Sequence, residues 1–294
     1  MRVLSRVFEP QPIVRLELVR IFAPLAILGF LSTRLVHADD WLSTAGFHPP
    51  ALAGDWRQPA SLPLLSPGLA WVFAAALALA ALATAAGLVT RISATALALL
   101  LGYATLADRL EAFTVSKLGT VIAVALALSP AGARYSVDAW RRRREPPPTA
   151  CSGGNVRFFQ ILVPAFYFSS GLCKASGDWL AERYVLWSHV HDSYQTPVSW
   201  FVANHLPPAA WTVMQATTLA FELGAPLWFG LRWTRPYALA YGLAMHALIG
   251  LMFGPVLWFA LLMIVLLVAG YAPIAWFGRA APHAVTPPLE NAPT

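Results

Sequence analysis

The sequence has few charged residues: Asp, Glu, Lys and Arg together make up 12% of its 294 residues. An ordinary soluble domain has roughly 25%. Hydrophobic residues account for 58% of the chain, and its mean hydropathy is +0.60. This composition excludes an ordinary soluble protein. It predicts an integral membrane protein in which helices of about 20 residues each use most of the chain.

Cysteine is also scarce, because only Cys151 and Cys173 are present. In the topology predicted below they fall on opposite sides of the membrane, so we expect no disulfide between them. The sequence has no zinc-type ligand spacing, no nucleotide-binding glycine signature and no repeat at a fixed period. These absences argue against a disulfide-stabilised domain, a nucleotide-binding domain and a repeat protein.

Long apolar runs are abundant and predict an all-α fold, a polytopic transmembrane bundle of about eight helices. The third, fourth and seventh runs are near the lower length limit for spanning, so seven or nine spans are alternatives, with re-entrant or tilted segments. The runs cover approximately residues 13–36, 66–89, 92–109, 112–130, 156–174, 208–230, 236–252 and 254–274.

The predicted organisation is one membrane domain over residues 1–274. A basic, proline-rich loop at 141–154 divides it into two helical halves, and a proline-rich tail at 275–294 is expected to be disordered. The first run follows two arginines, as in a signal peptide. Its apolar stretch is longer than the 7–15 residues of a signal core, so we interpret it as a retained helix.

Positive charges are distributed unevenly between the two sides, which predicts cytoplasmic N- and C-termini. The basic run at 141–144 stands beside three prolines without interleaved aromatic residues, so it favours contact with anionic lipid over nucleic acid. The predicted external cations are Arg34, Arg57, Arg109, Lys117, Lys174 and Arg183. The predicted cytoplasmic cations are Arg2, Arg6, Arg15, Arg20, Arg91, Arg134, Arg141, Arg142, Arg143, Arg144, Arg157, Arg232, Arg235 and Arg279.

An ionisable amine, Lys174, stands at the end of the fifth run and is followed by Asp178 and Trp179. An ionisable residue at this depth indicates a functional site. The external loop that follows, 178–208, is rich in aromatic rings with polar tips, which favour the headgroup zone. We expect it to cover a cavity; an aromatic belt with no pocket beneath it is the alternative. Its aromatic and histidine residues include Trp179, Tyr184, Trp187, His189, His191, Tyr194, Trp200, Phe201 and His205.

The alternating histidines His189 and His191 raise the question of a metal site. A spacing of two puts them on opposite faces of a helix but on one face of a strand, and no third ligand is evident nearby. We therefore expect interfacial histidines and no metal.

Polar residues also lie within other runs. His246 stands between two glycines, each four residues away, so it should face the bundle; a single interhelical hydrogen bond is the simpler role. Glu222 lies within the apolar run at 208–230, so inside the membrane it must be neutral, paired with a cation or solvated in a cavity. Glu17 and Arg20 can pair with one another or with Glu222 in a structural polar network. Lys117 could extend outward or lie near Lys174.

Several of these segments, in this order, resemble the membrane domain of vitamin K-dependent gamma-carboxylases and their bacterial relatives, the HTTM family. The similarity extends from about Arg15 to Tyr271. It rests on Tyr135-Ser136-Val137-Asp138, Tyr167-Phe168-Ser169-Ser170-Gly171-Leu172-Cys173-Lys174, Asp178-Trp179 and Met245-His246.

The resemblance implies that Lys174 is the base that deprotonates vitamin K hydroquinone. Apolar surroundings disfavour the cationic form of an amine, which suits this role. His246 would stabilise a developing anion or the carbon dioxide adduct. The implied quinone or substrate pocket would include Lys117, Tyr167, Asp178, Trp179, His189 and His191. The family's Asn-His pair has no counterpart, because the corresponding stretch reads Phe113-Thr114-Val115-Ser116-Lys117.

Two classes of function follow from this resemblance. The first is a quinol-dependent oxidoreductase or carboxylase-like enzyme that uses reduced vitamin K or menaquinone. The alternative is a non-enzymatic membrane scaffold for the maturation or export of a peptide or toxin; a transporter is a third reading. The expected partners are membrane lipid and a peptide substrate or neighbouring membrane protein, without nucleic acid. The expected location is a bacterial cytoplasmic membrane.

Overall fold

The computed structural model of the chain describes residues 7–48, 62–107, 113–142, 146–182, 184–191 and 194–277. Its regular structure is almost entirely helical, which confirms the all-α class. The α-helices are α2 (Val14–Leu35), α3 (Ala38–Leu42), α4 (Pro67–Ala86), α5 (Thr90–Ala107), α6 (Thr114–Ala127), α7 (Val137–Arg141), α8 (Gly153–Ala175), α9 (Val185–His189), α10 (Pro197–His205), α11 (Pro208–Gly230), α12 (Arg235–Met252) and α13 (Leu257–Tyr271). The remaining elements are strands β1 (Gln11–Pro12) and β2 (Ala150–Cys151) and the 3-10 helices η2 (Gly254–Val256) and η3 (Ile274–Phe277).

Each of the eight predicted apolar runs coincides, to within three residues at either end, with one long helix, namely α2, α4, α5, α6, α8, α11, α12 or α13. Among the described residues, four segments are long and apolar enough to cross a membrane, and α6 is a shorter apolar helix. The four are α4, α5, α8 and Gly254–Tyr271, which joins η2 to α13. The chain is therefore an integral membrane protein, and a count of eight spans stays a prediction.

Parts of the predicted organisation fall outside the described residues. The predicted tail begins inside η3, and everything from residue 278 lies outside the described part. The predicted basic loop contains the end of α7 and strand β2, and its residues 143–145 are not described. The predicted topology cations that are not described are Arg2, Arg6, Arg57, Arg109, Arg143, Arg144, Arg183 and Arg279.

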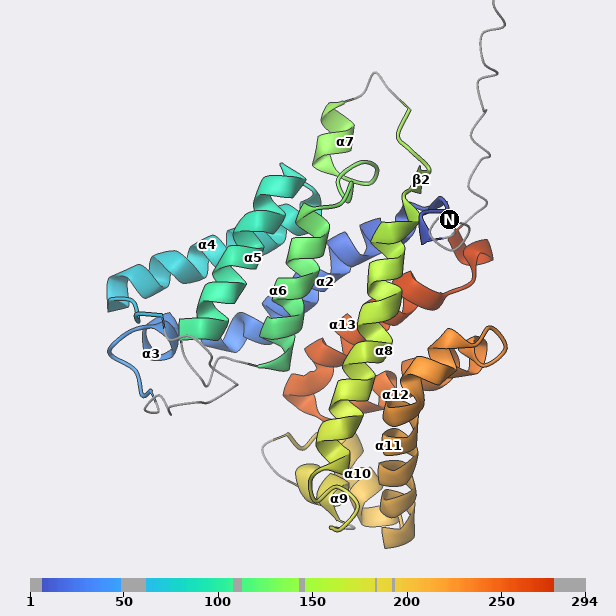
Figure 1. Cartoon of the computed structure of the whole chain (residues 1–294). Helices are drawn as coiled ribbons and strands as arrows, with labels where there is room; N and C mark the ends of the chain where they lie inside the picture. The colour runs from blue at the N-terminus through green and yellow to red at the C-terminus, as the bar shows by residue number, and fades with distance from the viewer. Residues whose placement is uncertain are drawn as a thin grey trace, which may run out of the picture.

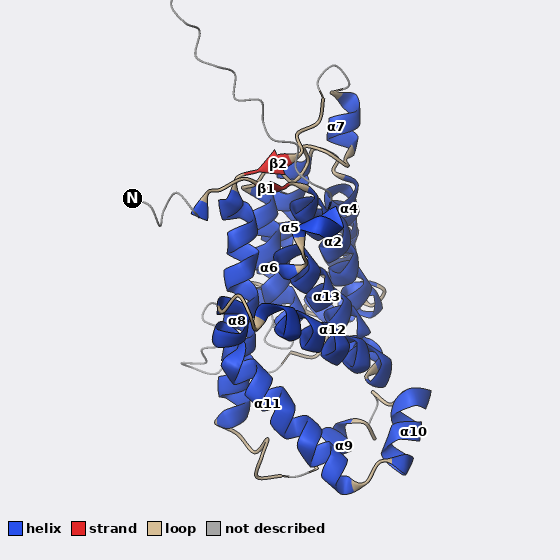
Figure 2. Ribbon diagram, turned by 90° about the vertical axis from the view of Figure 1, so that its right-hand side faces the viewer, coloured by secondary structure: helices blue, strands red, loops and turns tan. Residues whose placement is uncertain are grey.

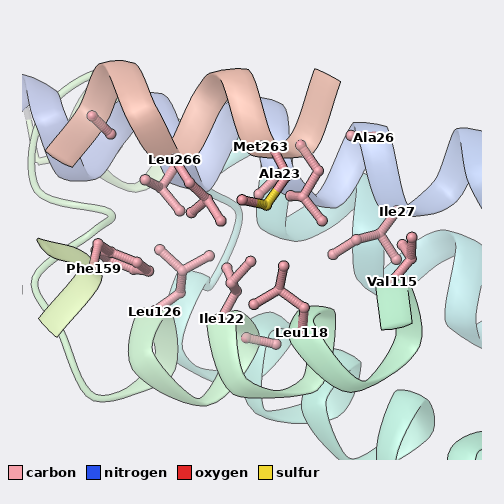
Figure 3. Close-up of a cluster of buried hydrophobic side chains, with 14 of the residues drawn as sticks. Ala23, Ala26, Ile27, Val115, Leu118, Ile122, Leu126, Phe159, Met263 and Leu266 are labelled. Atoms are coloured by element: carbon pink, nitrogen blue, oxygen red, sulfur yellow. The ribbon is translucent and has the colours of Figure 1, made fainter. Parts of the chain in front are cut away.

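Helix α2 lies at the centre of the bundle and packs against α4, α6 and α13 (Figure 1). On one side α4, α5 and α6 pack in sequence; on the other, α8 packs against α11 and α13. Small residues of α2 such as Ala23 let its neighbours approach closely. Their larger side chains, including Leu118 and Ile122 of α6 and Met263 of α13, fill the space between the helices (Figure 3).

The two ends of the bundle differ. At one end β1 and β2 pair antiparallel, with Gln11 opposite Cys151, and this pair ties the start of α2 to the start of α8. Helix α7 lies at the same end, whereas α9 and α10 lie at the other (Figure 2). The segment that contains α9 and α10 therefore sits where α8 ends.

The polar pair of α2 belongs to the packing near the first end. Arg20 is fully buried and donates from Nε to Glu17 Oε2 at 2.9 Å. Its other nitrogens donate to the backbone oxygens of Thr84, Ala85 and Tyr135. Because each charge is bonded, the pair can stay buried and tie α2 to α4 and to the turn before α7.

Candidate functional site

Lys174 lies in the last turn of α8 and is bonded to α11. Its Nζ donates to both carboxylate oxygens of Glu222, at 2.7 and 2.6 Å, and to Ser170 Oγ at 2.8 Å. The ring centroid of Trp179 lies 5.2 Å from Nζ. The side chains of Lys174 and Glu222 are 24% and 8% exposed, so this is a largely buried ion pair with an aromatic face over the cation.

A glycine explains why α11 can bring Glu222 to this position. Gly171 faces α11, and a Cβ placed there would lie 2.9 Å from the backbone nitrogen of Leu223. Without a side chain the two helices pack closely enough for Glu222 to reach Lys174. Of the two pairings expected for Glu17 and Arg20, the structure has the one with each other, and Glu222 pairs with Lys174 instead.

Tyr167 and His246 form a second polar pair, between α8 and α12. The Tyr167 hydroxyl lies 2.7 Å from His246 Nε2, and both side chains are 2% exposed. His246 Nδ1 is buried and makes no hydrogen bond with the described protein atoms. Tyr167, Gly171 and Lys174 lie four and three residues apart, so they occupy one face of α8.

Both pairs border a cavity of about 1150 Å³. Its walls come from the ends of α2 and α6 on one side and from α8, α11 and α12 on the other. Trp179, Leu186, His189 and Tyr194 also line it; they belong to the segment between α8 and α11, whose described residues 178–182, 184–191 and 194–207 are called the cover segment below. The lining is mainly apolar and aromatic. It comprises Phe30, Thr33, Arg34, Phe113, Thr114, Val115, Phe166, Tyr167, Ser169, Ser170, Cys173, Lys174, Trp179, Leu186, His189, Tyr194, Met214, Thr217, Thr218, Glu222, Tyr241, Ala244, Met245, His246, Leu248, Ile249, Met252, Phe253, Pro255, Val256 and Phe259.

The structure brings only some of the predicted site residues together. Five of them line the cavity, and these are Lys174, His246, Tyr167, Trp179 and His189. The other three, Lys117, Asp178 and His191, are exposed and are not among the lining residues.

His189 and His191 of the cover segment each contact the backbone carbonyl oxygen four residues earlier in the chain. His189 Nδ1 lies 2.7 Å from the carbonyl oxygen of Val185, and His191 Nδ1 lies 2.7 Å from that of Trp187. No group of three or more His, Cys, Asp or Glu side chains within the described ranges is placed to hold a metal ion.

Sequence reasoning missed three contributors to the site. Glu222 was recognised as costly but not as the partner of Lys174, and Ser170 and Gln215 were not singled out. The available signal was charge complementarity, because the run at 156–174 ends in the cation Lys174 and the run at 208–230 contains the acid Glu222. Only the packing of α8 on α11 places those two residues opposite one another.

A model of the HTTM domain matches residues 8–276. The chain belongs to the HTTM family. No match was found among curated proteins, and none among solved structures. The HTTM domain extends from the start of the described chain to η3, so the cavity and both polar pairs lie within it. Both helical halves of the HTTM domain contribute to the cavity wall.

Proposed function

We propose that this HTTM protein is a quinol-dependent membrane oxidoreductase with Lys174 as its base. The observation that carries the proposal is the position of the Lys174–Glu222 pair on the wall of a large cavity lined mainly by apolar and aromatic residues. The cavity would be reached from the external side, next to the described residues of the cover segment.

The residues present suit a reduced quinone. Ligand pockets commonly measure about 300–1,000 Å³ and combine apolar walls with a few polar groups, and this cavity of about 1150 Å³ has that character. Phe113, Phe166 and Phe259 offer aromatic faces to a flat ring, and His246 Nδ1 offers a buried polar atom to a ring oxygen. A bound quinol supplies weakly acidic hydroxyl groups and two electrons.

The ion pair provides a route to a neutral amine. A proton can pass from Lys174 Nζ to Glu222 Oε2 across 2.6 Å, which leaves a neutral amine beside a neutral acid. Apolar surroundings favour the neutral amine and acid over the ammonium and carboxylate ions, because burying charged groups is costly. The Nζ lone pair then accepts the proton of a substrate hydroxyl, and the pair ends with an ammonium group beside a carboxylic acid.

The second polar pair supports the same chemistry. When the Tyr167 hydroxyl donates to His246 Nε2, the neutral imidazole carries its hydrogen on Nδ1. Nδ1 is then a donor available to an oxygen that gains negative charge as its proton leaves. A fixed donor in a site shielded from water stabilises such charge strongly.

The test is oxidation of reduced menaquinone or vitamin K hydroquinone by the purified protein in lipid nanodiscs under oxygen. Lys174→Ala should lower turnover by at least about 100-fold, the usual contribution of a general base. Lys117→Ala is the matched control, because Lys117 is the only other lysine in the sequence and does not line the cavity. An equal loss in both variants would contradict the assignment.

Binding can be measured separately from turnover. Cys173 lines the cavity, whereas Cys151 is buried in β2. Reduced quinone should therefore slow alkylation of Cys173 in native protein and in Lys174→Ala. Folded protein with neither protection nor turnover over a range of quinols would overturn the proposal. A secreted peptide that crosslinks to the cover segment independently of Lys174 would then favour the scaffold.

A further inference from the structure

Gln215 of α11 is the most completely bonded side chain near the cavity that the proposed chemistry does not use. It is 1% exposed. Its Nε2 donates to the carbonyl oxygens of Trp179 at 2.6 Å and Glu182 at 3.2 Å, and its Oε1 accepts from the backbone nitrogen of Leu186 at 3.3 Å. Both amide hydrogens and the amide oxygen therefore hold the first part of the cover segment.

The same residue also fixes the indole of Trp179. Trp179 Nε1 donates to the backbone oxygen of Gln215 at 3.0 Å, while the Trp179 carbonyl oxygen accepts from the Gln215 side chain. Two bonds to one residue determine where the ring lies. The ring then lies over the Lys174 ammonium, 5.2 Å from its centroid.

Packing alone does not call for an amide at this position. One turn earlier on α11, Trp211 packs with Val190 and Met252 in a small hydrophobic core that holds the rest of the cover segment. A leucine or methionine at position 215 would extend that core without burying a polar group. The amide is explained by its hydrogen bonds to backbone groups of the segment that carries Trp179.

We propose that Gln215 is a positioning residue that holds the Trp179 ring over Lys174, and so sets the location of the base and the closure of the cover. The consequence for catalysis rests on the proposed quinol chemistry. The consequence for structure does not, because the contact between Trp179 and Lys174 can be followed without turnover.

The experiment compares Gln215→Met, Trp179→Ala and Trp179→Phe with native protein in nanodiscs. Gln160→Met is the matched control: Gln160, near the start of α8, bonds the Gly270 carbonyl oxygen far from the cavity. The first readout is amide hydrogen exchange over the peptide from Trp179 to Leu186. The second is acetylation of Lys174 by acetic anhydride, with Lys117 as the internal reference.

Gln215→Met should increase amide exchange in this peptide and increase Lys174 acetylation by about tenfold. The reason is that the variant loses hydrogen bonds that stabilise the closed form of this segment against local opening. Trp179→Ala should raise acetylation equally, and adding it to Gln215→Met should have no further effect, because both changes remove one contact. Trp179→Phe loses the indole N–H but keeps an aromatic ring and the backbone carbonyl bonded by Gln215 Nε2, so it should restore most of the protection. Gln160→Met should change neither readout.

Quinol turnover provides the third readout. Gln215→Met and Trp179→Ala should lower kcat with little change in KM, and Trp179→Phe should restore it. Unchanged Lys174 acetylation in Gln215→Met would overturn the positioning role whether or not native protein oxidises quinols. Raised acetylation with unchanged kcat would overturn its link to catalysis. Absence of turnover in native protein would contradict the proposed function and leave the acetylation result to decide the positioning role.

Discussion

At the scale of single residues, the Lys174–Glu222 pair governs both stability and chemistry. Two charges taken out of water are tolerated only when they are well bonded to one another. Here both carboxylate oxygens accept from Nζ, and Ser170 accepts the third hydrogen of the ammonium group. Removing one partner should therefore be worse than removing both.

Glu222→Gln should destabilise the folded protein by about 1–3 kcal/mol, because it leaves the Lys174 charge without its counter-ion. The effect is smaller than for a fully buried pair, because Lys174 is partly exposed to solvent. Lys174→Met alone should have an effect of similar size. The double variant Lys174→Met with Glu222→Leu should recover most of the stability. Thermal unfolding in nanodiscs of native protein, Lys174→Met, Glu222→Leu and the double variant gives the coupling energy. Additive losses would show that the pair is not coupled.

The sequence predicts which residues are unusual better than it predicts their partners. Lys174, Glu222 and His246 stand out because each interrupts an apolar run. The partnership of Lys174 with Glu222 depends on the approach of two helices at Gly171, and no periodicity in either helix encodes that approach. Lys117 and Asp178 have the chemistry expected at such a site but do not line the cavity.

At the scale of elements, α7 caps the start of α5. Asp138 accepts from the backbone nitrogens of Val89 and Thr90, at 2.8 and 2.7 Å, and from the Thr90 hydroxyl at 2.7 Å. The first turn of a helix has free backbone N–H groups, which a carboxylate satisfies well. The chain before this turn passes through positive φ angles at Gly87 (68°) and Val89 (46°), so α7 holds a sharp corner.

These contacts predict a pH dependence. Burial raises the pKa of the Asp138 carboxyl, but hydrogen bonds from Thr90 and Val89 and the charge of Arg142 outweigh burial, and the folded-state pKa lies below the ordinary value of 3.8. The carboxylate therefore contributes stability above about pH 4, which is lost as the pH falls through the lowered pKa. Asp138→Ala should lower the free energy of unfolding by about 1 kcal/mol at pH 7, and the difference should shrink below pH 4.

Thermal unfolding between pH 3 and 7 measures this effect, with the exposed Asp40→Ala as the control that should show no comparable change. A constant difference between native protein and Asp138→Ala over this range would contradict the capping role.

Helices of this length were predictable because apolar runs record them directly. The short elements α7, β1 and β2 were not predictable, because each depends on a partner far away in the sequence. Asp138 of α7 bonds the start of α5, and Gln11 of β1 pairs with Cys151 of β2. The run at 254–274 begins with the 3-10 turn η2 before α13, since Pro255 lacks a backbone N–H and Phe253, which precedes η2, has an extended backbone.

At the scale of the whole molecule, Arg15, Arg20 and Arg235 lie at the end of the bundle opposite the cover segment. Arg15 donates to the carbonyl oxygens of Ala269 and Ala272 at the end of α13, and Arg235 lies over the Tyr271 ring near the same end. The cover segment with its exposed tryptophans lies at the other end (Figure 2). If cationic loops face the cytoplasm, the end with Arg15 and Arg235 is the cytoplasmic one, and this orientation stays a prediction.

The orientation can be tested with two matched substitutions at the ends of α8, in a Cys173→Ser background. Ser152 precedes α8 and Ser176 follows it, and both are exposed. If the cationic end is cytoplasmic, a membrane-impermeant maleimide should label Ser176→Cys in intact cells and should label Ser152→Cys only after permeabilisation. The reverse pattern would put the cavity on the cytoplasmic side. It would also place the Lys174 base away from external substrates, because the cover segment and the cavity lie at the end where Ser176 stands.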